Sequence, residues 1–114
     1  MLRKTILFLI VLCFVSASVG AVFAAESGNA RKGKYTYRKV YESCNKRGEV
    51  DSSKPILNPD AKTQDQWKRA FDKKDFDQFK CRDEWNKLSQ NDLNDINKYL
   101  CDHAADSPTP AKCN

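Results

Sequence analysis

Cysteine is the residue type that most constrains this chain, because the chain is short and its first residues have the pattern of an export signal. It has 114 residues and five cysteines. Two basic residues near the start precede an apolar run from Ile6 to Val15, and small residues follow as far as Ala25. This order is typical of a cleavable secretory signal peptide. We therefore predict a signal peptide over residues 1–25 and no membrane span after its cleavage.

Cleavage would remove Cys13 and leave four cysteines, which are Cys44, Cys81, Cys101 and Cys113. Four cysteines in a small exported chain favour disulfides, for which three connectivities are possible. No two of them have the Cys-x-x-Cys spacing of a thioredoxin-like redox motif. A zinc site formed by three of them with His103 is an alternative, although the usual paired spacings of zinc ligands are absent.

The 89 residues from 26 to 114 are enough for one small domain. They contain 18 Lys and Arg and 15 Asp and Glu, a net charge of +3. The basic residues alternate with acidic clusters along the chain, which is typical of a solvated surface and not of a nucleic-acid-binding protein.

The hydrophobic pattern predicts an all-α domain, because no segment alternates between apolar and polar residues as a strand would. Asn29 can cap a first helix, and the pairs Thr63 with Gln66 and Ser89 with Asp92 have the spacing of capping boxes. A segment rich in turn residues, from about 45 to 62, separates the first two helices. The predicted helices cover residues 29–42, 63–72, 76–88 and 89–104.

This arrangement resembles the c-type cytochrome fold, in which N- and C-terminal helices cross, with short middle helices and a long loop. In the family, a glycine of the first helix permits a close crossing and an aromatic residue four positions later packs into it. Gly33 and Tyr37 match these positions in GNARKGKYTYRKVYESCN, while Ile96 and Tyr99 in DINKYL match the partner helix. The resemblance implies one cytochrome c-like domain over residues 26–114.

The haem-attachment signature of that family, Cys-x-x-Cys-His, falls on Tyr41-Glu42-Ser43-Cys44-Asn45. The second cysteine is kept as Cys44, but Tyr41 replaces the first and Asn45 replaces the histidine. Pro55 and Leu57 resemble the loop residues that support this histidine and line the haem. An asparagine amide cannot supply the imidazole nitrogen that iron needs, so the resemblance implies a vestigial haem site.

A second iron ligand is also missing, because the methionine that usually supplies it has no counterpart. The only methionine, Met1, belongs to the predicted leader. His103 is the sole histidine and lies in the last turn of the last predicted helix, where the helix dipole favours it, so iron ligation by His103 is an outside alternative. We therefore expect no cofactor. The alternative is haem c attached through Cys44 alone.

Without haem, something else must fill the interior, and the chain is rich in aromatic residues. We expect Tyr41, Trp67 and Phe71 to collapse into the vacated space; a residual apolar cleft for another small molecule is the alternative. Disulfides would replace the haem as a covalent staple. The even number of cysteines suggests the hypothesis that Cys44 pairs with Cys101 on the crossing helix and that Cys81 pairs with Cys113, and a free Cys44 thiol is the alternative.

Three functions follow for comparison. The first is a haem-free exported cytochrome c-like protein that acts as a binding or accessory module, beside a cytochrome or another periplasmic protein. The second is a one-electron carrier with single-thioether haem attachment at Cys44. The third, an enzyme with a dyad of Cys44 and His103, lacks an orienting group and an oxyanion motif. We expect the first function, in the periplasm, and no enzymatic activity.

Overall fold

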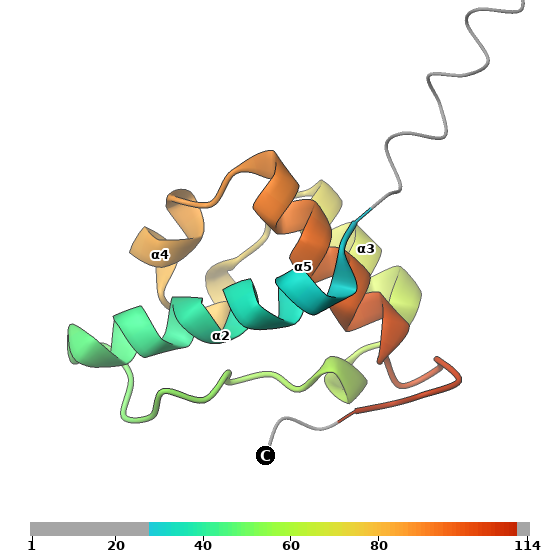
Figure 1. Cartoon of the computed structure of the whole chain (residues 1–114), viewed down its shortest axis with the longest axis horizontal. Helices are drawn as coiled ribbons and strands as arrows, with labels where there is room; N and C mark the ends of the chain where they lie inside the picture. Colours follow the sequence, from blue (N-terminus) through green and yellow to red (C-terminus); the bar gives the residue numbers. More distant parts are fainter. Residues whose placement is uncertain (1–27, 112–114) are drawn as a thin grey trace, which may run out of the picture.

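The computed structural model describes residues 28–111, so the predicted signal peptide and Cys113 lie outside the described part. The predicted all-α class is confirmed for these residues, whose regular elements are all helical (Figure 1). The elements in chain order are α2 (Ala30–Lys46), η2 (Pro59–Ala61), α3 (Gln64–Asp72), η3 (Asp77–Phe79), α4 (Arg82–Asn86) and α5 (Gln90–Asp102).

The first and last of these helices, α2 and α5, cross in close contact (Figure 1). Gly33 lies at the crossing, and a Cβ atom at this position would overlap the backbone carbonyl of Asp95. Near the crossing, the backbone N–H of Asn29 donates to the buried Asp95 carboxylate over 2.8 Å. The expected crossing of N- and C-terminal helices is therefore present, and the glycine is what permits its closeness.

Three of the four helix starts agree with the caps read from the sequence. The Asn29 side chain accepts a hydrogen bond from the Lys32 amide, and capping boxes form at Thr63 and at Ser89. Helix α2 continues four residues beyond the predicted end at residue 42. This extension carries Cys44 to a fully buried position one turn after Val40.

The single helix predicted over residues 76–88 is wrong, because the chain breaks into η3 and α4. Lys80 and Cys81 both have positive φ, 55° and 58°. The Phe79 carbonyl accepts a hydrogen bond from the Tyr41 hydroxyl, and the Cys81 amide donates to Glu49. These contacts with distant residues replace the bonds that a continuous helix would make there.

Aromatic rings fill the interior, as expected for a collapsed core. Trp67 and Phe79 stack with their ring centroids 5.9 Å apart, and Phe79 also lies 4.7 Å from Trp85. Their side chains are at most 1% exposed. The core further includes these buried or packed side chains: Tyr37, Val40, Tyr41, Cys44, Phe71, Cys81, Leu93, Ile96, Tyr99 and Leu100.

The long irregular segment between α2 and α3 is held against this core by hydrogen bonds from aromatic side chains. Tyr37 donates to the Leu57 carbonyl over 2.7 Å, and the Trp67 indole donates to the Pro59 carbonyl over 2.8 Å. The Asn45 amide donates to Val50 over 2.9 Å. The segment therefore wraps the aromatic core in a defined course.

We predict that Gly33→Ala destabilises the protein by about 1–3 kcal/mol, the usual cost of overpacking. The sign is the reverse of the ordinary effect, since alanine in a helix interior is normally about 1 kcal/mol better than glycine. Urea unfolding followed by circular dichroism measures the change. Ser43→Ala, an exposed substitution in the same helix, serves as control. Equal stability of Gly33→Ala and the parent chain would contradict the tight crossing.

Candidate functional site

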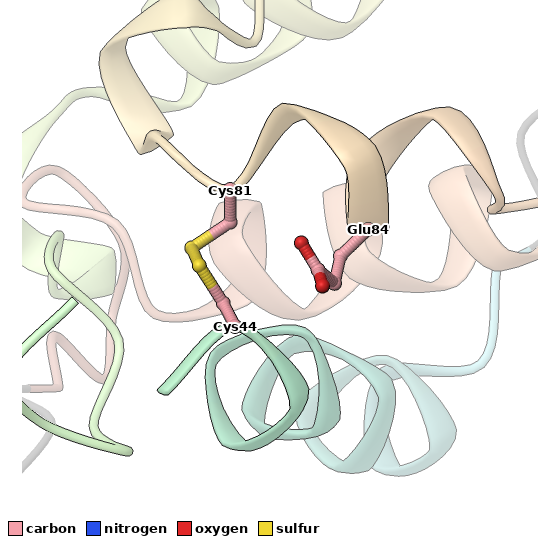
Figure 2. A group of neighbouring side chains, drawn as sticks. All are labelled: Cys44, Cys81 and Glu84. Atoms are coloured by element: carbon pink, nitrogen blue, oxygen red, sulfur yellow. A yellow bond between two sulfur atoms is a disulfide. The ribbon is translucent and has the colours of Figure 1, made fainter. Parts of the chain in front are cut away.

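The centre of the predicted haem-attachment motif is occupied by a disulfide between Cys44 and Cys81. Cys44 lies in the last turns of α2, and Cys81 directly precedes α4 (Figure 2). Both residues are fully buried. The expectation of a disulfide is confirmed, and the alternative of a free Cys44 thiol is wrong.

The expected pairing is wrong, since Cys44 bonds to Cys81 and not to Cys101. Cys101 lies on α5 and faces α3, with its sulfur 3.3 Å from the Asn97 side-chain oxygen and 3.7 Å from the Gln64 carbonyl. It is a buried free thiol, and burial raises its pKa. The pairing of Cys81 with Cys113 is excluded in the same way, because Cys81 is already bonded.

Three charged side chains surround the disulfide, and we refer to them with the two half-cystines as the disulfide cluster: Cys44, Cys81, Arg47, Glu49 and Glu84. The Arg47 guanidinium donates to both carboxylate oxygens of Glu84, each over 2.6 Å. Glu49 accepts from the Cys81 amide and lies 3.6 Å from Arg47. The cluster thus joins α2, the following loop and α4.

The electrostatics of the cluster follow from the two hydrogen bonds that the Arg47 guanidinium donates to Glu84. Glu84 is 7% exposed, and burial alone would raise the pKa of its carboxyl. The hydrogen bonds from Arg47 outweigh this effect and lower the pKa of Glu84, so the carboxylate stays ionised. In return, the same bonds raise the pKa of the Arg47 guanidinium. Two hydrogen bonds between the planar guanidinium and carboxylate groups fix the relative orientation of the Arg47 and Glu84 side chains.

Metal binding is the first chemistry to test here, because the Cys44 and Cys81 sulfurs and a Glu84 oxygen lie within 4.8 Å of one another (Figure 2). Soft metals bind thiolates, and two sulfurs bonded to each other are not thiolates. The oxidised cluster therefore connects the end of α2 to α4 through one covalent bond and one ion pair. Among the described residues, Cys101 and His103 do not join this group, so the zinc site considered from the sequence as an alternative is not assembled there.

The residues of the predicted haem site come together in part, but with other partners. Tyr41 and Cys44 are fully buried, and their polar atoms bind Phe79 and Cys81. Asn45 bonds to the loop through Val50, while Leu57 supplies its carbonyl to Tyr37. Pro55 is half-buried in the same loop. A thioether at Cys44 needs the sulfur that the disulfide already uses, so these residues do not fit a haem.

His103 lies away from this arrangement, at the end of α5. Its Nδ1 is 2.8 Å from the Thr109 carbonyl oxygen, and its ring lies 5.4 Å from that of Tyr99. The imidazole thus holds the C-terminal segment against the helix. The structure does not bring it to Cys44, either as an iron ligand or as the base of a dyad.

A cavity of about 390 Å³ opens between α3 and α5, beside the free Cys101. Charged and amide groups line it, including Lys68, Asp72, Asn97 and Lys98. It is therefore polar, unlike the apolar cleft considered from the sequence, and it lies next to Gly28 rather than at the aromatic core.

The sequence did not single out Arg47, Glu49 or Glu84 as members of a site. Each lies among charged residues that are typical of a solvated surface, and Glu84 lies 35 positions after Glu49, too far for a local pattern to connect it with the other two.

Comparison of the chain with protein-family models, curated proteins and solved structures finds no match. A membrane-spanning helix, with sufficient length and apolar character, is not found among residues 28–111.

We predict that the double variant Cys44→Ala with Cys81→Ala loses about 4 kcal/mol of unfolding free energy. The chain-entropy model gives this value for a sequence separation of 37 residues. Chemical denaturation of the oxidised proteins measures it, with Cys101→Ala as a matched control that removes a buried thiol but no cross-link. A loss no greater than that of the control would contradict a structural role for the disulfide.

We also predict that acid reduces the contribution of the Arg47–Glu84 ion pair to the free energy of unfolding. Because the folded pKa of Glu84 is lowered below 4.5, its contribution is fully present above that pH and is lost as the pH falls through the folded pKa. Unfolding free energies measured from about pH 6 to about pH 3 should therefore converge for the parent and Glu84→Gln. Asp83→Asn, at a more exposed neighbour of Arg47, is the control. A constant gap between parent and Glu84→Gln would refute the assignment.

Proposed function

We propose that this chain is an exported cytochrome c-like protein that works without haem, as a binding or accessory module rather than an electron carrier or an enzyme. The observation that carries the proposal is the disulfide between Cys44 and Cys81. It takes up the one sulfur that the degenerate motif keeps for haem attachment. A stable disulfide also agrees with an oxidising compartment such as the periplasm.

The relation to c-type cytochromes is supported by the crossing of α2 and α5. Gly33 lies against the backbone of Asp95 and Ile96, as the glycine of the resembling motif would. Tyr37, four residues later, is fully buried and lies 6.3 Å from Tyr99 on α5. The four positions at which the crossing helices resemble the family are therefore in contact: Gly33, Tyr37, Ile96 and Tyr99.

The absence of haem in this proposal is supported by what fills the interior. Phe79 contacts both Trp67 and Trp85 in the core, and the Tyr41 hydroxyl donates to the Phe79 carbonyl over 3.0 Å. A porphyrin would have to displace several of these rings. Binding partners would accordingly meet the outer surface, where a cytochrome or another periplasmic protein is the proposed companion.

The test is the intact mass of the unreduced protein, secreted by a bacterium that has haem-attachment machinery. We expect the mature chain to lack two hydrogens for each disulfide, to carry no haem increment and to show no Soret absorption. The variant Cys81→Ala is the matched control, because it frees the Cys44 sulfur without restoring a histidine. A haem adduct on the parent protein would refute the proposal and favour the electron carrier with a thioether at Cys44.

A further inference from the structure

The exposed face of α2 has a composition unlike the rest of the molecule. It contains six basic residues and one acidic residue, and we call it the basic face: Arg31, Lys32, Lys34, Tyr35, Arg38, Lys39, Glu42 and Lys46. Residues 28–111 contain 17 Lys and Arg and 14 Asp and Glu, a net charge of +3. The basic face alone contributes +5. The remaining described surface is therefore net negative, by two charges.

The charges of the basic face are mostly uncompensated. Lys39 pairs with Glu42 at 3.8 Å, and within the described part of the chain its other five cations have no ion pair. In the rest of the described chain, 13 acidic residues outnumber 11 basic ones, and three of these basic residues form ion pairs, as Arg82 does with Asp77 at 2.6 Å. The concentration of positive charge on α2 is thus local.

Helix stability does not explain this placement. The first turn of α2 carries no acidic residue, although acidic side chains are favoured there and cations are disfavoured by the helix dipole. Arg31 and Lys32 lie in that turn, where they add to the positive potential of the helix end. A sequence selected only for stability would place these residues near the other end.

An aromatic side chain lies within the basic face. Tyr35 is 62% exposed, and the Lys39 ammonium lies 5.4 Å from its ring centroid. Tyrosine and arginine are the residue types that most often dominate binding energy at protein interfaces. The exposed ring gives this face a contact that an anion alone would not use.

We propose that the basic face of α2 is the surface on which this protein docks an acidic patch of a partner protein. The inference rests on the proposed function, since it names the surface and partner chemistry of that binding module. Opposite charge would steer the encounter, and Tyr35 would supply apolar contact within it. Because the opposite side of α2 is fixed by the crossing with α5, docking needs no rearrangement of the helix.

The first experiment uses an oligoglutamate peptide as the probe of an acidic surface, added to the ¹⁵N-labelled oxidised protein. We expect amide shifts to concentrate on residues 31–39 and to vanish at high salt. The triple variant Arg31→Glu, Lys34→Glu and Arg38→Glu should bind at least ~10-fold more weakly. The matched control, Arg69→Glu with Lys73→Glu and Lys87→Glu, makes the same change in net charge and should keep most of the binding.

Folding is measured on the same samples, because the helix dipole makes a specific prediction. The α2 triple variant should unfold close to the temperature of the parent, since the gain from Arg31→Glu in the first turn offsets the new i,i+4 repulsion that Lys34→Glu and Arg38→Glu create with each other and with Glu42. Weaker binding together with undiminished stability supports a docking role. Equal loss of binding in both triple variants, or shifts spread over all lysines, would overturn the proposal.

The second experiment identifies the occupant by placing a photo-crosslinking phenylalanine analogue at position 35 in the secreting cell. A crosslink to a peptide rich in Asp and Glu, lost in the α2 triple variant, supports the proposal. No crosslink, a crosslink to a second copy of this chain, or tighter binding to phosphatidylserine vesicles than to the peptide would overturn it. Haem content is read separately from the mass, so failure of the proposed function is distinguishable from failure of docking.

Discussion

The close crossing of α2 and α5 is the constraint on which the rest of the structure depends. Helices approach this closely only where a side chain is missing, and Gly33 supplies that gap against Asp95. The crossing brings the aromatic side of α2 over α5, so that Tyr37 contacts Tyr99 and the ring cluster around Phe79. The core therefore forms on one side of α2, and the other side is left to solvent.

The disulfide cluster closes the end of α2 that the crossing does not reach. The crossing fixes the first turns of α2, while Cys44 and Arg47 tie its last turns to the start of α4. Between the two anchors, aromatic hydroxyl and indole groups hold the loop that covers the core. A small domain has few residues for its core, so a covalent cross-link and a partly buried ion pair add stability where apolar burial is limited. Trp85, whose buried indole N–H finds no acceptor among the described residues, shows that this packing is not fully satisfied.

Local signals in the sequence predicted most of the fold, and contacts between distant residues account for what it missed. The sequence predicted three helix caps, because each cap bonds to a residue only three positions away: Asn29, Thr63 and Ser89. The break at Lys80 and Cys81 depends instead on Tyr41 and Glu49, which lie more than 30 residues earlier. The disulfide partner of Cys44 could not be predicted either, because it lies 37 residues away and four cysteines allow three pairings. Of the disulfide cluster, the sequence singled out Cys44 and Cys81 as disulfide candidates, but Arg47 and Glu84 meet only in three dimensions.

The residues on the two sides of α2 have different explanations: packing and bonding explain those on the buried side, but not the cations on the exposed side. On the buried side, each of Gly33, Tyr37 and Cys44 has a role that packing or bonding explains. On the exposed side, no comparable structural role explains the cations near the start of the helix, and their placement opposes the helix dipole. Where a local rule is broken without a structural gain, function is the remaining explanation. A helix fixed on its buried side by the glycine crossing and the disulfide would hold those charges in a constant geometry, which would lower the entropic cost of binding the proposed partner.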